Sequence, residues 1–293
     1  MARNKQGLAR GIPKEVEKLV RQACGFGCVM CGAIPYDYDH LETEFNAAEV
    51  HDPDDIVLLC DTHHRMKGTL LSVDAIKRAR KLRLSEKSKF RFKLPATNQD
   101  FEVNWAGNII AASDNSVVVD GAPILSFVRT DNEMEPLLIS GRFRDRFGQV
   151  VCDISNNVFI GHAEHLGDFT LVNNRFRYSL PGGLMGLAFD LSDRGIDIKY
   201  AYHVKGDVHV FAEGDLLQVG NLFNAARFRG NRFVDMQHGI IVESCSDNFV
   251  YDGVDLNKFP WNEMIGGTYS RGYAGVYIER PRRYRVSSNY DRI

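Results

Sequence analysis

The sequence predicts an α+β protein with a small, cysteine-rich N-terminal domain (residues 1–94) followed by an all-β domain (residues 95–293). Four of the six cysteines lie within the first sixty residues. Helical spacing of apolar residues is confined to the N-terminal third, whereas short alternating runs bounded by Gly, Asn and Asp dominate after it. A chain of 293 residues suits two domains, each large enough to bury its own core.

The N-terminal domain is expected to combine helices with two short strands. Pro13 suits the first turn of a helix, and the apolar residues after it are spaced for one buried face. The stretch from Cys24 to Gly32 is too rich in glycine for a helix and favours a tight loop. We therefore predict helices over residues 12–23 and 73–85 and another beginning near His63 or His64, with strands over residues 36–41 and 56–59.

The second domain is expected to be sandwich-like. Residues 95–100 suit a linker, and residues 145–148 suit a hairpin turn. An Asn-plus-aromatic motif recurs at irregular intervals, which suits turns in a sandwich and also the alternative of a β-helix. The predicted strands cover residues 116–119, 149–154, 169–172, 196–200, 208–211 and 239–242, and the motif occurs at Asn156–Phe159, Asn173–Phe176, Gly220–Phe223 and Gly230–Phe233.

Basic charge is concentrated towards the end of the N-terminal domain, although the whole chain has a net charge of −2. Residues 65–93 contain 11 Lys and Arg residues, opposed by Asp74 and Glu86 alone. Such a stripe is typical of a surface that contacts phosphates, and the alternative is a solvated helix face. No apolar run approaches the roughly 20 residues of a membrane span, and the polar N-terminus lacks a secretory signal, so we expect a cytoplasmic protein without membrane contact.

Two short motifs predict a structural zinc site. In a chain without an export signal, clustered cysteines favour metal binding over disulfides. Zinc prefers four tetrahedral sulfur or nitrogen ligands, and a site with four protein ligands leaves no position open for a substrate. Cys24 competes for one ligand position, whereas Cys152 and Cys245 stand alone in apolar runs and are predicted to be buried. The motifs are a CxxC pair and a CxxH pair, formed by Cys28 and Cys31 and by Cys60 and His63.

Side chains suited to phosphodiester hydrolysis lie between these pairs and directly after them. Asp39 and His40 are neighbours in the insert, and His64 follows the second pair. If the two short strands pair and a helix packs across them, the three side chains converge. One carboxylate and one imidazole then hold a hard divalent cation, while the second imidazole, with an ordinary pKa of about 6.5, acts as a general base.

The order of these motifs resembles the HNH (ββα-metal) endonucleases. The resemblance rests on Arg21–Gly32, Tyr38–His40 and Ile56–His64, and it covers roughly residues 10–90. The sequence is particularly similar to the HNH effector nucleases of bacterial anti-phage systems, in which a cyclic-oligonucleotide-sensing domain follows the nuclease domain. The resemblance implies a ββα-metal fold for the N-terminal domain, with Cys28, Cys31, Cys60 and His63 holding the structural zinc.

The same resemblance implies roles for the remaining site residues. His40 becomes the general base, and Asp39 and His64 become the ligands of a catalytic Mg²⁺ or Mn²⁺. Basic residues that meet the DNA backbone are expected at Arg65 and Lys67. The middle Asn of the family falls at Asp55, so this sequence departs from the pattern, and an Asp there is expected to orient the His40 loop or to bind the metal.

These observations predict a metal-dependent DNA endonuclease of bacterial anti-phage defence that is regulated through its β domain. That domain does not resemble the sensing domain of related nucleases. We expect it to bind a small-molecule or phage-derived activator, to form a homo-oligomer, or to read DNA with the basic tail at residues 280–285, for which the alternative is a disordered, solvated end. The alternatives are a restriction-type nuclease whose β domain recognises modified or specific DNA, and a non-catalytic, zinc-stabilised DNA-binding module.

Overall fold

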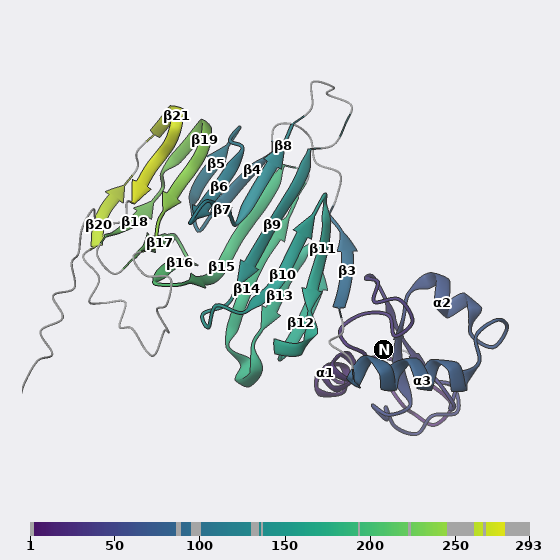
Figure 1. The fold of residues 1–293 in the computed structure, drawn as a ribbon. Coiled ribbons are helices and arrows are strands. Elements are labelled where there is room, and N and C mark those ends of the chain that lie inside the picture. The colour runs from purple at the N-terminus through teal and green to yellow at the C-terminus, as the bar shows by residue number, and fades with distance from the viewer. Residues whose placement is uncertain are drawn as a thin grey trace, which may run out of the picture.

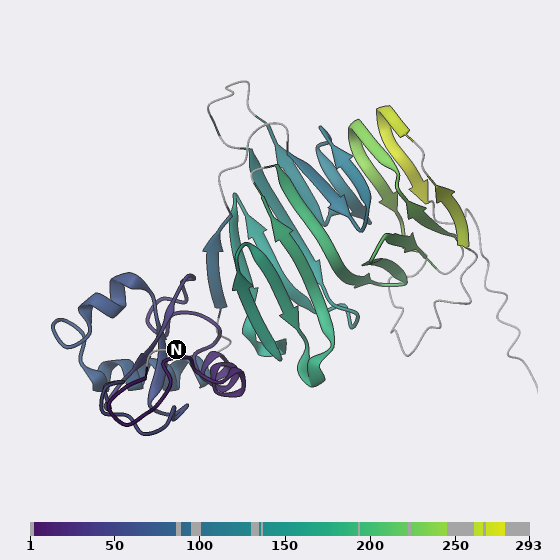
Figure 2. The same cartoon turned by 180° about the vertical axis from the view of Figure 1, so that it is seen from behind.

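The α-helices lie in the first part of the chain, and most of the strands follow them. The structure is a computed structural model that describes residues 3–85, 89–94, 101–129, 135, 137–192, 194–221, 224–244, 261–265 and 268–278. We call residues 3–85 the N-terminal unit and the described residues from 89 onward the β body. Figures 1 and 2 show the N-terminal unit beside one end of an elongated β body, whose far end carries β20 (Trp261–Ile265) and β21 (Thr268–Ile278). No helix in the described segments is long and apolar enough to cross a membrane.

The N-terminal unit surrounds a two-stranded sheet with three helices. The two strands pair antiparallel, with Asp39 opposite Val57 and His40 opposite Ile56. All four residues of the second strand are buried, because helices pack against it, and they join Val20 in a small core of their own. The elements are α1 (Lys14–Ala23), β1 (Asp37–His40), β2 (Ile56–Leu59), α2 (Asp61–Met66) and α3 (Val73–Ser85), with α2 starting ahead of the expected His63.

Hydrogen bonds join the strands of the β body into one closed, branched sheet. It branches because β15 and β19 each pair with two shorter strands along one edge and with a third strand along the other. Besides β20 and β21, the strands are β3 (Lys89–Lys93), β4 (Glu102–Trp105), β5 (Asn108–Ala111), β6 (Asn115–Val119), β7 (Ala122–Pro123), β8 (Leu125–Val128), β9 (Leu138–Arg144), β10 (Val150–Ser155), β11 (Val158–His162), β12 (Asp168–Val172), β13 (Arg175–Ser179), β14 (Met185–Leu191), β15 (Gly195–Lys205), β16 (Val208–Glu213), β17 (Leu216–Gly220), β18 (Ala225–Arg229) and β19 (Arg232–Val242).

Near the N-terminal unit, two antiparallel layers face each other across a phenylalanine-rich core. The first layer has the order β3-β11-β10-β9 and the second the order β12-β13-β14-β15. Phe90 on β3 lies 4.4 Å from Phe169 on β12, and Phe159 on β11 lies 4.8 Å from Phe176 on β13, measured between ring centroids. Strand β3 lies in the segment that the sequence assigns to the first domain, yet it packs in the core of the β body.

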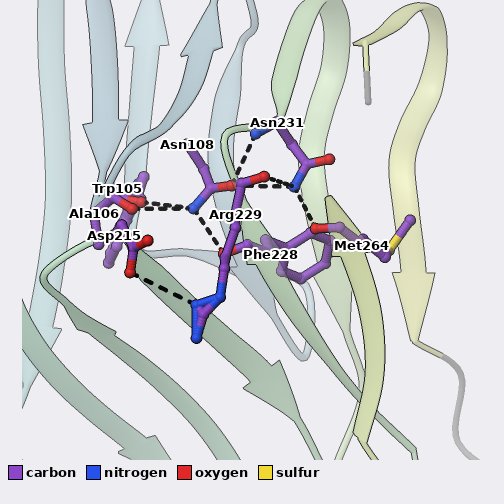
Figure 3. Close-up of polar contacts among 8 residues, drawn as sticks. All are labelled: Trp105, Ala106, Asn108, Asp215, Phe228, Arg229, Asn231 and Met264. Carbon is purple, nitrogen blue, oxygen red and sulfur yellow. Dashed lines mark hydrogen bonds and ion pairs between the residues drawn. The ribbon is translucent and has the colours of Figure 1, made fainter. Parts of the chain in front are cut away.

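Strands stack in parallel at the far end of the β body. Strands β18 and β19 run parallel to β20 and β21, and β5 and β6 run parallel to β19. Two buried amides cross this stack: Asn231 Nδ2 donates to Asn108 Oδ1 at 3.2 Å and to the Met264 carbonyl at 2.8 Å (Figure 3). Asn108 in turn donates to the Phe228 carbonyl at 3.1 Å. Asn231 satisfies the side-chain oxygen of Asn108, and both side-chain nitrogens donate to backbone carbonyls, so the stack buries these groups at little cost.

The recurring Asn-plus-aromatic motif has more than one structural role. Asn156 and Asn157, like Asn173 and Asn174, have positive φ angles and form tight hairpin turns, a conformation that asparagine tolerates well. Asn231 instead belongs to the buried amide pair of the parallel stack. Cys152 is buried, as expected, whereas Cys245, the linker at residues 95–100 and the basic tail at residues 280–285 lie outside the described residues.

His203 on β15 makes the stability of the β body sensitive to acid. It is buried, and its Nδ1 accepts a hydrogen bond from the Arg144 backbone N–H at 3.2 Å. Burial, with help from Arg144 and Lys205, lowers the pKa of His203 from 6.5 to about 3. The unfolded chain takes up this proton near pH 6.5, so the unfolded state binds more protons below that pH, and stability falls as the pH drops from 6.5 towards 3.

We therefore expect His203→Gln to remove part of this acid sensitivity. Between about pH 7.5 and 5, the wild type should lose about 2 kcal/mol more free energy of unfolding than the variant, from about 1.4 kcal/mol per pKa unit. Urea unfolding at the two pH values measures the difference. Equal losses in the two proteins would show that His203 does not take up the proton on unfolding.

Candidate metal centre and adjoining pocket

Two cysteine-containing loops bring four ligand atoms together. Cys28, Cys31, Cys60 and His63 each offer one atom, and these atoms lie within 4.8 Å of one another. The Cys28 Sγ–His63 Nδ1 distance is 3.5 Å, and the Cys31 Sγ–Cys60 Sγ distance is 3.9 Å. Zinc bonds of about 2.3 Å to sulfur and 2.0–2.1 Å to nitrogen place tetrahedral ligands about 3.6–3.8 Å apart. The four residues form a cluster that can bind a metal ion such as zinc.

Glycines allow the first loop to turn tightly enough to present its two cysteines. A Cβ atom at Gly27 would lie 2.6 Å from the Gly32 carbonyl oxygen, and one at Gly32 would lie 2.6 Å from the Lys89 carbonyl oxygen. Gly32 also has a φ of 72°, which favours glycine. Cys60 and His63 lie at the start of α2, where one helical turn brings both side chains to the same side.

Cys24 lies apart from the cluster, although its position in the sequence made it a competing ligand. It is buried, and its Sγ accepts a hydrogen bond from the Leu58 backbone N–H at 3.4 Å. Burial raises the pKa of Cys24 to about 11, so the thiol remains protonated at neutral pH. Its role is to fill the core beside β2.

Asp39 and His64 meet at a pocket of about 340 Å³. Asp39 Oδ1 lies 3.6 Å from His64 Nε2, because β1 presents Asp39 towards the short helix α2. Lys67 follows that helix, and its ammonium group contacts Asp39 Oδ2 at 2.7 Å and also the His40 carbonyl oxygen. The pocket is lined by Arg10, Ile12, Tyr38, Asp39, His40, Glu44, Phe45, His64 and Lys67.

His40 lies at the same pocket in an environment that disfavours its charged form. Burial lowers the pKa of His40, and His51 lowers it further, against the opposing effects of Asp55 and Asp39. The centroid of the His40 ring lies 5.7 Å from that of His51 and 6.0 Å from that of Phe45. Its Nε2 is buried and has no hydrogen-bond partner in the described part of the chain. A neutral imidazole of this kind is able to accept a proton.

Asp55 and Arg65 lie away from the pocket lining. The Asp55 carboxylate accepts hydrogen bonds from the backbone N–H groups of Glu42 and Thr43 at 2.7 and 3.0 Å. It therefore holds the loop that follows His40. Arg65 is exposed and pairs with Asp61 at 2.7 Å one helical turn earlier. Of the two basic residues expected to contact DNA, Lys67 lines the pocket and Arg65 does not.

Sequence reasoning overlooked several residues of the pocket. Arg10 and Glu44 add one charge of each sign to its lining, and Tyr38 adds a phenol from the strand that carries Asp39. His51 lies outside the pocket lining, but its ring packs beside that of His40. None of these residues belongs to a sequence motif with a recognisable spacing. The one available signal was that Tyr38 and His40 lie two residues apart on a predicted strand and therefore share one of its faces.

Arg21 connects the pocket to the β body. It is a buried residue of α1, and its guanidinium donates two hydrogen bonds to Asp168 of β12, at 2.9 and 2.7 Å. A third goes to the Tyr38 hydroxyl at 2.9 Å. Burial alone lowers the pKa of Arg21, but the hydrogen bonds with Asp168 and Tyr38 outweigh it and raise the pKa above its ordinary value. This contact fixes the N-terminal unit against the end of β12.

Replacing Asp168 by Ala is expected to destabilise the protein by about 3 kcal/mol, since it leaves the buried charge of Arg21 with the more distant Glu17, at 3.6 Å, as its remaining acidic partner. Thermal or urea unfolding measures the change. The matched control is Asp197→Ala, which removes the half-buried partner of the exposed Lys199 and should cost less than about 1 kcal/mol. Equal effects of the two substitutions would show that the Arg21 contact adds no stability beyond that of a surface pair.

Comparison with known proteins places the chain in no family. No protein-family profile matches it, and neither a curated protein nor a solved structure shows significant similarity to it. An assignment of function therefore rests on the geometry of the metal cluster and the adjoining pocket.

Proposed function

We propose that the protein is a metal-dependent DNA endonuclease whose N-terminal unit is an HNH (ββα-metal) centre. The observation that carries the proposal is the convergence of Asp39, His40 and His64 on one pocket, directly beside the Cys/His cluster. Strand β1 supplies Asp39 and His40, and the short helix α2 supplies His64, while β2 pairs with β1 between them in the order ββα. This set offers a metal-binding carboxylate, a metal-binding imidazole and a base, which together suit phosphodiester hydrolysis.

The Cys/His cluster is proposed to hold a structural zinc ion. Its four protein ligands complete a tetrahedron, so the ion has no position for a substrate. Instead it fixes the loop after α1 to the start of α2, and His64 is the residue directly after the ligand His63. The cluster thus sets the position of His64 relative to β1.

A second cation, Mg²⁺ or Mn²⁺, fits between Asp39 and His64. Their ligand atoms are 3.6 Å apart, so an ion about 2.1 Å from each can touch both. When bound, such an ion stabilises the negative charge that develops on the phosphate and on the leaving oxygen. The position of Lys67 also lets its ammonium group contribute positive charge at the pocket.

The chain's own residues are proposed to orient and deprotonate the attacking water. His40 accepts the proton, and the bonds from Glu42 and Thr43 to Asp55 hold the loop behind it. Asp55 thus performs the orienting role at the position where the family has Asn. Arg10 and Lys67 supply positive charge on the pocket wall for a phosphate backbone.

Cleavage of supercoiled plasmid with Mg²⁺ or Mn²⁺ tests the proposal. We expect nicking or linearisation by the wild type, and a rate at least about 100-fold lower for Asp39→Asn, because the neutral amide binds a hard cation poorly. The matched control is Asp37→Asn, on the exposed end of the same strand, which should retain wild-type activity. Metal-dependent cleavage that survives Asp39→Asn would place the catalytic centre elsewhere.

The proposal extends to anti-phage defence, with the β body controlling an otherwise indiscriminate nuclease. The buried contact between Arg21 and Asp168 gives the β body a physical connection to the pocket. Measuring cleavage against protein concentration and oligomeric state checks this control, and full activity of a ligand-free monomer would exclude it. Comparing modified with unmodified plasmid distinguishes the restriction-type alternative. DNA binding without any cleavage would establish the non-catalytic one.

A further inference from the structure

One outer face of the β body carries an unusual excess of positive charge. In the layer β3-β11-β10-β9, alternate residues point inward to the phenylalanine core, and the others lie on the outer face. We call the outer cations the basic face: Lys89, Arg91 and Lys93 on β3, and Arg142 and Arg144 on β9. Arg91 pairs with Ile160, which pairs with Asp153, which pairs with Arg142. The two arginines therefore lie on one line across the sheet.

The acid within this face is already neutralised. Asp153 accepts a bond of 2.6 Å from Arg142 and one of 2.9 Å from His162. Partial burial alone raises the pKa of Asp153, but these two partners outweigh it and hold the pKa below its ordinary value. The β11 residues between the two rows of cations, Val158 and Ile160, carry no charge. The face therefore has a net positive charge even after its internal pair is counted.

The cations of β3 have no acidic partner in the described part of the chain, and all three are exposed. A row of lysines often protects a free sheet edge from pairing with another chain. That explanation does not apply to the middle of β3, because both of its edges are occupied. One edge pairs with β11, and on the other Arg91 exchanges backbone hydrogen bonds with Gly32 and Ile34 of the N-terminal unit.

We propose that the basic face binds the phosphate backbone of nucleic acid as an accessory surface. Lys89, Arg91 and Lys93 are spaced two residues apart, so the row extends about 13 Å. Over that length a DNA duplex presents one negative charge per roughly 1.7 Å of its axis, which offers every cation a phosphate. The choice of DNA rests on the proposed function, but the binding itself requires no cleavage.

The contact of β3 with Gly32 and Ile34 places this surface next to the loop that holds two of the cluster cysteines. A duplex bound to the basic face is thus held beside the N-terminal unit. Backbone contacts of this kind raise affinity for every sequence equally. The face supplies affinity, and the pocket supplies chemistry.

Fluorescence anisotropy with a labelled duplex of about 20 base pairs tests the proposal. The intact chain is measured without added divalent metal over a range of KCl concentrations. The triple variant Lys89→Gln, Arg91→Gln and Lys93→Gln should bind about tenfold or more weakly, and its plot of log affinity against log salt should be shallower by about two to three. The control removes the same charge from the opposite layer, by Arg175→Gln, Arg177→Gln and Lys199→Gln, and should bind like the wild type.

The outcomes separate this proposal from the proposed function. If the first triple variant binds DNA with wild-type affinity and salt dependence, or if both triple variants weaken binding equally, the basic face is not the binding surface. If the wild type prefers vesicles containing phosphatidylserine to the duplex, the partner is a membrane and the proposal is wrong. Plasmid cleavage is measured in parallel, and binding without cleavage in the wild type would count against the nuclease alone.

Discussion

Replacing Cys60 by Ser is expected to abolish binding of the proposed structural zinc and to unfold the N-terminal unit. Cys60 Sγ lies 3.2 Å from His63 Nδ1 and 3.9 Å from Cys31 Sγ, so its loss removes one of the four ligand positions of the tetrahedron. Zinc binding in small domains contributes on the order of 10–16 kcal/mol of apparent folding free energy. The small core around Val20 and β2 does not supply enough stability to compensate for the loss of that amount. We expect metal content to fall from about one zinc per chain to near zero.

Metal analysis and limited proteolysis measure the two effects separately. Cleavage by protease should concentrate in residues 3–85, while the β body stays protected by its own phenylalanine core. The matched control is Cys24→Ala, which alters a buried cysteine outside the cluster and should retain the zinc. A Cys60→Ser protein that keeps its metal, or a Cys24→Ala protein that loses it, would show that the ligand set is wrong.

Replacing His40 by Ala is expected to lower the DNA cleavage rate by a factor of about 10² to 10⁴, the usual contribution of a general base. The zinc content and the fold should stay unchanged, because the His40 side chain belongs to the pocket and not to the cluster. Its Nε2 accepts no hydrogen bond among the described residues, so truncation breaks no bond at that atom. Single-turnover cleavage of plasmid measures the rate.

The neighbouring His51 provides the control for this prediction. Its Nε2 lies 2.9 Å from the Ala9 carbonyl, and its ring faces His40 without lining the pocket. His51→Ala should therefore cut DNA within about tenfold of the wild type, since it removes no proton acceptor from the reacting water. Similar losses in both variants would indicate a structural role for the histidine pair. Insolubility of His40→Ala comparable to that of Cys60→Ser would count against the catalytic assignment.

Local patterns in the sequence were sufficient to predict much of the N-terminal unit. The CxxC and CxxH spacings identified all four members of the cluster, because one tight loop and one helical turn each impose the distance between two ligands. The strand at Ile56–Leu59 and the helix at Val73–Ser85 have the predicted bounds. In each case the information lies within about a dozen neighbouring residues.

The sequence alone did not determine how the β body is arranged. Alternation of apolar and polar residues along a strand indicates which residues face inward, but it does not indicate which other strand pairs with that strand. Strand β3 therefore looked like the end of the first domain, although Phe90 and Phe92 belong to the core of the second. The Asn-plus-aromatic motif likewise marks a hairpin turn at Asn173 and a buried stack at Asn231.

The contacts that join the two parts of the molecule required the tertiary structure. Arg21 and Asp168 are 147 residues apart in the chain, and no local pattern marks either as a partner of the other. The basic face likewise forms only when β3 and β9 are brought into one sheet. The sequence determined by itself which side chains form the Cys/His cluster, because short-range spacing sets the distances within each pair. Folding alone decided what those side chains contact, because long-range pairing depends on the whole core.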